Sequence, residues 1–172
     1  GTVYGAGLSE HQKALLAAQG ATVADYTGAE NGTVILGSGC ADQALLEKAT
    51  SAKKLILLAP QNFGFAGLPA EASEAPMPAV FAAENVYTSG LPYAGGYLTG
   101  AEYGDIFTGA AFYAQPQVPV VSGLGVQADG AARMAALCGV FETESGTVAL
   151  CTLKTDAENP FTDALLLNLV SN

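Results

Sequence analysis

The sequence contains no tryptophan, a single histidine and only six basic residues, against sixteen acidic ones. The resulting net charge of −10 leaves no basic surface to neutralise phosphates, so we exclude DNA and RNA as partners. The same deficit argues against electrostatic docking on anionic membranes, and no apolar run approaches the ~20 residues that span a bilayer. We therefore expect a soluble domain that binds neither nucleic acid nor membrane.

Cysteine is also scarce, and its three occurrences, Cys40, Cys138 and Cys151, are widely spaced. Because there is no Cys-x-x-Cys pair and His11 is the one histidine, the chain offers neither a metal-ligand pattern nor a disulfide scaffold. Buried thiols are the simplest interpretation, since free cysteine is among the most frequently buried residue types. One pair could still oxidise outside the cell, so the cysteines leave the compartment open.

What the sequence does contain favours one folded domain over residues 1–172. Half of the residues are hydrophobic and 13% are charged, which fits neither a disordered nor a low-complexity chain. A chain of this length can bury a core without disulfide or metal support. It opens on Gly1 with no initiator methionine, so we expect a processed or excised form.

The first sixty residues alternate apolar runs with helical patterns. The runs cover residues 2–4, 21–26, 33–36 and 55–59. Ser9, with Gln12 three residues later, forms the capping-box pattern of a helix that ends at Gly20, and a second helix covers residues 41–49. Apolar runs separated by helices are typical of parallel strands covered on both sides. The sequence therefore predicts an α/β fold with a doubly wound, mainly parallel sheet and helices on both faces.

Residues 60–125 form an irregular, aromatic-rich insertion. Seven of the eight prolines and most of the aromatic residues fall here, and no clean helical period is present. We expect short strands around Val80-Phe81 and Ile106-Phe107, a helical turn near Tyr93–Leu98, and long ordered loops between them. Loops of such length in a compact domain are usually functional or in contact with another module.

The C-terminal residues return to regular patterns. Residues 134–142 and 147–153 predict an antiparallel hairpin across the turn 143–146. Asn159 before Pro160 predicts a last helix, because a capping residue followed by proline at the first helical position is a typical helix start. We thus expect an antiparallel hairpin near the C-terminus, followed by one helix.

Several short segments resemble a known family. They are Val86–Leu91, Gly146–Lys154, Glu158–Pro160 and Leu165–Val170. Together with the order of elements, they resemble the class I glutamine-amidotransferase-like, flavodoxin-like domains attached to bacterial glycoside hydrolases of the beta-galactosidase and beta-glucuronidase kind. The resemblance implies a domain that packs against catalytic modules, or trimerises with like subunits, and carries out no chemistry itself. It also implies a periplasmic or extracellular location if the parent hydrolase is secreted.

The residues needed for amidotransferase chemistry are missing. That chemistry needs a cysteine on a strand-to-helix turn, a histidine to activate it and a carboxylate to orient the histidine. Cys40 follows Gly37-Ser38-Gly39 on such a turn, but one strand too early, and no His-x-Glu pair follows a late strand. His11 lies in the first helix. We predict no catalytic residue, with a nucleophilic Cys40 of unusual mechanism as the minor alternative.

The N-terminal Gly5-Ala6-Gly7 turn is similar to the start of a dinucleotide-binding unit, and Asp25 closes the second strand where a ribose-binding carboxylate would lie. Glu10 stands where the third glycine belongs, and its carboxylate would face the pyrophosphate at the helix N-terminus. The tight turn alone explains both glycines. We therefore predict no cofactor.

Glu84, Glu102 and Asp105 lie in the irregular region, where two carboxylates could flank a glycosidic bond. Acidic loop residues are far more often solvated surface, and the ~250-residue barrel of such hydrolases does not fit in this chain. We expect no glycosidase activity from the chain itself.

Aromatic residues are the remaining candidates for a binding or interface surface. The set is Tyr87, Tyr93, Tyr97, Tyr103 and Phe107, with Phe112 and Tyr113 beside it. Tyrosines combine contact area with a hydroxyl group and are enriched at interfaces. These rings could equally fill the core beneath long loops, and a sugar-stacking platform is a lesser form of the surface alternative.

The leading hypothesis is therefore a non-catalytic structural or interaction domain of a larger carbohydrate-active enzyme, whose partners are its neighbouring domains or like subunits. The alternative is a small stand-alone α/β enzyme or ligand-binding protein. It would use the loops at the carboxyl ends of the parallel strands, Gly5–Ser9, Gly37–Cys40 and Pro60–Phe65, because open α/β sheets bind ligands there.

Overall fold

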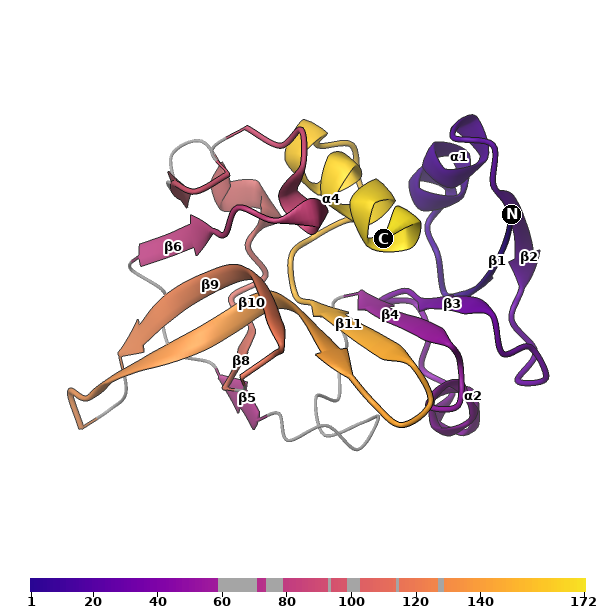
Figure 1. Cartoon of the computed structure of the whole chain (residues 1–172), viewed down its shortest axis with the longest axis horizontal. Helices are drawn as coiled ribbons and strands as arrows, with labels where there is room; N and C mark the ends of the chain where they lie inside the picture. Colours follow the sequence, from indigo (N-terminus) through magenta and orange to yellow (C-terminus); the bar gives the residue numbers. More distant parts are fainter. Residues whose placement is uncertain (59–70, 74–78, 93, 99–102, 114, 127–128) are drawn as a thin grey trace.

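The structure is a computed structural model, described for residues 1–58, 71–73, 79–92, 94–98, 103–113, 115–126 and 129–172. Its strands form one mixed sheet with the order β2-β1-β3-β4-β11-β10-β9-β6-β7 (Figure 1). Two further strands extend it, since β8 pairs with β10, and β5 pairs with β8. No helix in the described residues is long and apolar enough to cross a membrane.

One half of the sheet is parallel. Its strands are β2 (Thr22–Asp25), β1 (Thr2–Ala6), β3 (Thr33–Leu36), β4 (Lys54–Leu58) and β11 (Thr147–Cys151). Each strand pairs in parallel with its neighbour in this order. The prediction of an α/β fold with parallel strands is confirmed.

The helices lie on both faces of the parallel half, with α1 (Glu10–Ala18) and α4 (Pro160–Ser171) on one face and α2 (Gln43–Ala49) on the other (Figure 1). The capping box of α1 is present: Gln12 N–H donates to Ser9 Oγ at 3.1 Å, and Ser9 N–H donates to Gln12 Oε1 at 2.9 Å. Asn159 caps α4 through its Oδ1, which accepts from Phe161 N–H. Both helix starts confirm what the sequence predicts.

Alternate residues of the parallel strands supply two cores, one under each helical layer. Ile35 and Ile56 belong to the cluster that contains Leu16 of α1 and Leu165 of α4. Their neighbours along the strands, Val34, Leu36, Leu55 and Leu57, belong to the cluster against which Leu45 and Leu46 of α2 pack. Because both faces are covered, these strands are apolar throughout rather than alternating.

The other half of the sheet is antiparallel. Its strands are β5 (Glu71–Ser73), β6 (Ala79–Ala82), β7 (Tyr97–Leu98), β8 (Ala111–Tyr113), β9 (Val118–Val126) and β10 (Ala132–Glu142). The predicted hairpin is β10–β11, closed by a hydrogen bond of 2.8 Å from Thr143 N–H to Gly146 O. Since β11 pairs with β4 on its other side, this hairpin joins the two halves.

Three expectations for residues 60–125 are wrong. Ile106 ends a 3-10 turn, η3 (Gly104–Ile106), rather than lying in a strand. The expected helical turn near Tyr93–Leu98 is replaced, in its described part, by β7, while a 3-10 turn, η2 (Val86–Thr88), lies earlier. The nine-residue strand β9 replaces an expected loop. Its Pro119 is tolerated because the β9–β10 register shifts beside its partner Gly139.

Candidate functional site

The loops after β1 and β3 meet where the strand order reverses, which is the usual ligand site of an open α/β sheet. Here the two loops contact each other directly: Gly37 N–H donates to Ala6 O at 2.8 Å, and Gly39 N–H donates to Gly7 O at 3.2 Å. A Cβ on Gly7, whose φ is +66°, would collide with the backbone of Cys40. Backbone therefore occupies this crevice, and the glycines serve the packing of one loop on the other.

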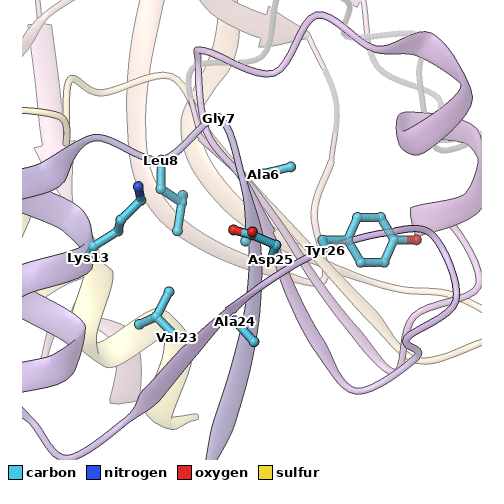
Figure 2. Close-up of a pocket in the computed structure, with 9 residues that line it drawn as sticks. Ala6, Gly7, Leu8, Lys13, Val23, Ala24, Asp25 and Tyr26 are labelled. Carbon is cyan, nitrogen blue, oxygen red and sulfur yellow. The ribbon is translucent and has the colours of Figure 1, made fainter.

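A cavity of about 210 Å³ lies beside this crevice, at the carboxyl ends of β1 and β2 (Figure 2). It brings together the Gly5-Ala6-Gly7 turn and Asp25, the two parts of the dinucleotide-like motif. Figure 2 shows Lys13, Leu8 and the Asp25 carboxylate on one side of the strands, while Tyr26 points to the other.

We call this cavity the β1–β2 pocket. Three of its contacts are unlike those of a nucleotide-binding site. Leu8 covers Gly5 so closely that a Cβ there would collide with the leucine side chain. Lys13 Nζ is paired with Glu10 Oε1 at 2.9 Å. The N-terminus of α1 is already capped by Ser9, so the N–H group that would face a pyrophosphate has a partner in the chain.

A second cavity, of about 220 Å³, opens at the carboxyl ends of β3, β4 and β11. We call it the carboxyl-end pocket. Its lining residues are Gln12, Ser38, Leu58, Thr108, Lys154, Thr155 and Asp156. They come from α1, from the ends of three adjacent strands and from the loop before β8.

The walls of the carboxyl-end pocket are held by buried hydrogen bonds. Gln12 Nε2 donates to Thr155 Oγ1 at 3.0 Å, and both side chains are buried. Thr108 Oγ1 donates to the carbonyl oxygen of Thr152 at 2.7 Å, and Lys154 N–H donates to Ile106 O at 2.8 Å. These bonds hold the Gln12, Thr155 and Thr108 side chains in place.

Two charged residues complete this lining. Lys154 is exposed and is the only basic residue in the lining. Asp156 Oδ1 is buried and has no hydrogen-bond partner in the described part of the chain. Sequence reasoning did not single out either residue. The available signal was a polar stretch directly after the last parallel strand, at the edge where the strand ends meet.

His11, the one histidine of the sequence, and Cys40 have different partners. His11 Nε2 lies 2.7 Å from Asp163 Oδ1, which links α1 to α4. Cys40 is half-buried in the loop after β3, packed against the α2-side core. Among the described residues, no hydrogen bond or ion pair joins the two, and no group of His, Cys, Asp and Glu side chains could hold a metal ion.

The aromatic candidates do not form one surface. Tyr103 packs against Phe161 with tilted rings whose centroids are 5.5 Å apart, and Tyr87 and Phe107 are half-buried against the same core. Tyr97 is 68% exposed, with its ring edge-to-face on Phe81 at 6.1 Å. Tyr93 lies outside the described residues. Their role as a contact surface stays a prediction, with Tyr97 the most accessible of the described members.

The remaining sequence candidates have different surroundings. Phe112 and Tyr113 are buried, and Arg133 lies 4.1 Å above the Tyr113 ring. Glu84 and Asp105 are exposed, and Glu102 lies outside the described residues.

No family model and no curated protein matches the sequence. The fold is similar to that of a crystal structure from Thermoplasma acidophilum, of a protein provisionally described as one of the subunits of GMP synthase. The TM-score is 0.52 at 9% sequence identity, and the match covers 99% of this chain and 92% of that one. At this identity the likeness establishes the fold alone, which is a glutamine-amidotransferase-like α/β fold.

Proposed function

We propose that the chain is a non-catalytic interaction domain of amidotransferase-like fold, and that it belongs to a larger carbohydrate-active enzyme. The observation that supports a non-catalytic role is the identity of the residues that follow the parallel strands β4 and β11. In the sequence, β4 is followed by Ala59-Pro60 and β11 by Thr152-Leu153-Lys154, so neither strand is followed by a cysteine or a histidine. Cys151, the last residue of β11, is completely buried. Acyl transfer from glutamine requires both groups in one site.

The positions of the existing cysteine and histidine support the same conclusion. Cys40 packs among loops and α2, whereas the hydrogen bond of His11 goes to Asp163. A nucleophile needs a base within hydrogen-bond reach, about 2.6–3.2 Å. The Nε2 atom of His11 is instead hydrogen-bonded to the Asp163 carboxylate, and this contact links α1 to α4.

The carbohydrate-active parent is supported by the segments that resemble the accessory domains of glycoside hydrolases. Two of these segments contact each other: Asn168 Nδ2 in α4 donates to the carbonyl oxygens of Tyr87 and Ser89 at 3.0 and 2.9 Å. The Val86–Leu91 turn and the last helix are thus hydrogen-bonded to each other, which supports treating the two segments as one feature of the proposed resemblance.

A glutaminase assay tests the non-catalytic part. The purified chain is incubated with glutamine, and we expect no more ammonia than from the heat-denatured chain, with Cys40→Ser indistinguishable from the wild type. Ammonia release that disappears in Cys40→Ser would show a working nucleophile and overturn the proposal.

The parent is tested separately. We expect the transcript that encodes this chain to continue in frame into a glycoside hydrolase module, and the separately expressed module to co-elute with this chain on gel filtration. A reading frame that ends at both borders of this chain, or a parent module that elutes independently, would contradict the interaction role.

A further inference from the structure

We propose that Cys138 and Cys151 are a redox pair: a low-molecular-weight disulfide, acting on the chain before it has folded, joins them by a cross-strand disulfide bond between β10 and β11. The proposal goes beyond the interaction role and depends neither on the parent protein nor on Cys40. It rests on the register of the two strands, on the face of the sheet that both thiols share and on their burial.

The two cysteines lie directly opposite each other in the β10–β11 hairpin. The neighbouring pair is hydrogen-bonded, since Thr152 N–H donates to Leu137 O at 2.7 Å. Hydrogen-bonded and non-hydrogen-bonded pairs alternate along an antiparallel ladder, so Cys138 and Cys151 occupy a non-hydrogen-bonded site. In such a site the two Cα atoms are typically about 4.5 Å apart, which lies within the roughly 4.4–6.8 Å that a disulfide spans.

Both thiols lie on the same face of the sheet. Opposite residues of an antiparallel pair share a face, and both cysteines belong to the core cluster that contains Leu165 of α4. Cys40 packs against the other cluster, on the α2 side. The hydrogen bond to Cys151, which raises the pKa of Cys138, supports direct contact between the two thiols. In the folded chain, Cys138 and Cys151 are therefore each other's partners.

The pair lies where the two halves of the sheet join. Cys151 ends β11, which pairs in parallel with β4, whereas β10 pairs with the antiparallel strands β8 and β9. The β9–β10 register shifts at Cys138, so the ladder on that side of β10 is irregular. A disulfide at this point would hold β10 on β11 and join the two halves covalently.

The reaction is two successive thiol–disulfide exchanges. The thiolate of one cysteine attacks a sulfur of the oxidant, whose S–S bond breaks and releases one small thiol. The thiolate of the second cysteine then attacks the protein sulfur of the mixed disulfide and releases the other small thiol. The protein loses two protons and two electrons, and the oxidant is reduced to two thiols.

Burial decides when this exchange takes place. Both thiols are completely buried, and the raised pKa of Cys138 suppresses its reactive thiolate. Strand β11 lies between β4 and β10, so exposing Cys151 breaks strand pairing on both sides. The oxidant therefore reaches the pair only in the unfolded or folding chain, and the folded protein keeps the redox state in which it folded.

Refolding of the Cys40→Ser chain from urea, in mixtures of reduced and oxidised glutathione, tests the proposal. Free thiols are trapped with iodoacetamide, and peptide mapping by mass spectrometry gives the fraction of chains with the bond. The equilibrium constant for bond formation should be about 100-fold larger in the refolded chain than in the chain kept in urea, because the fold holds the two thiols together. The oxidised chain should melt about 5–10 °C above the reduced one. Equal equilibrium constants, or a lower melting temperature of the oxidised chain, would overturn the proposal.

A matched control moves one thiol to the other face of the sheet. Cys151→Ala combined with Leu150→Cys, in the same Cys40→Ser chain, closes a loop of nearly equal length, but Leu150 belongs to the opposite core cluster. This chain should oxidise in urea as its parent does and gain nothing on refolding. An equal gain would mean that proximity along the chain, and not the register, brings the thiols together. The comparison of the parent chain in and out of urea does not require the control to fold.

The timing is tested on the folded wild type. When the reduced, folded chain meets oxidised glutathione, Cys40 should form a mixed disulfide, while Cys138 and Cys151 remain thiols for at least about tenfold longer. The chain that was oxidised before folding should resist dithiothreitol until urea is added. Closure of the bond in the folded chain as fast as Cys40 reacts would show that the oxidant reaches the pair, and would contradict the proposed order of oxidation and folding.

Discussion

Gln12 donates a hydrogen bond of 3.0 Å to the hydroxyl of Thr155 in the interior of the protein, between the first turn of α1 and the segment after β11. The same amide also accepts from Ser9 N–H and completes the helix cap. One side chain thus joins the start of the chain to the end of the last parallel strand.

Gln12→Met should destabilise the protein by about 1–3 kcal/mol, because it leaves the Ser9 N–H and the Thr155 hydroxyl without their partners. Urea unfolding measures the change. Gln19→Met, at the exposed end of the same helix, is the matched control and should change stability by less than about 0.5 kcal/mol. Equal losses in the two variants would mean that the buried hydrogen bond contributes nothing.

Tyr26→Phe should raise stability by about 1 kcal/mol, since the Tyr26 hydroxyl is buried and has no partner among the described residues. Burial also raises the pKa of Tyr26 above its ordinary 10.0, with the nearby Glu30 adding to the shift. The folded protein therefore retains this proton at a pH where the unfolded chain has lost it. Stability should fall as the pH rises above 10 in the wild type, and less steeply in Tyr26→Phe.

Comparing the wild type with Tyr26→Phe isolates the contribution of Tyr26 to the pH dependence of stability. Burial lowers the pKa of Lys54, which makes stability rise with pH toward its ordinary value of 10.5, but this contribution is present in both. Tyr97→Phe serves as the control, because that tyrosine is 68% exposed. Parallel stability curves for the wild type and Tyr26→Phe above pH 10 would refute the prediction.

Gly7→Ala should cost more than Gly20→Ala, although both glycines have positive φ, +66° and +84°. The left-handed conformation alone costs a non-glycine residue about 1–2 kcal/mol. Nothing lies near a Cβ at Gly20, whereas a Cβ at Gly7 would collide with the Cys40 backbone, which adds about 1–3 kcal/mol of overpacking. Thermal unfolding of the two variants measures the difference in stability. Equal losses would show that the loops containing Gly7 and Cys40 can move apart at no cost in free energy.

Local signals are the reason that the parallel half could be predicted from the sequence. The caps at Ser9 and Asn159 lie within three residues of their partners. The strands β3 and β4 can be recognised from their own apolar residues, without knowledge of their neighbours in the sheet. The β10–β11 hairpin is also local, since its strands are joined by a short turn.

The antiparallel half and the carboxyl-end pocket depend on contacts between distant segments. Strand β9 contains Pro119 and two glycines, so its local propensity is poor, and pairing with β6 and β10 on both sides determines it. Lys154 and Asp156 reach the pocket only because β11 pairs with β4, and no local sequence pattern predicts this pairing. The aromatic residues show the same limit, since Tyr103 contacts Phe161 of α4, which is distant in the sequence.

Thiol labelling of the native chain at neutral pH should modify Cys40 alone, and no faster than a model thiol. Cys138 and Cys151 lie opposite each other in the β10–β11 register, and both are completely buried. The hydrogen bond to Cys151, together with burial, raises the pKa of Cys138 well above its ordinary value, which suppresses the reactive thiolate. Cys40 is half-buried in the loop after β3, so a labelling reagent can reach it, and no hydrogen bond or ion pair joins it to His11. Full labelling of the other two thiols is expected only in denaturant, and Cys40→Ser should abolish labelling of the native chain without changing its stability. A Cys40 that reacts much faster than a model thiol would show an activated nucleophile, which contradicts the non-catalytic role proposed above.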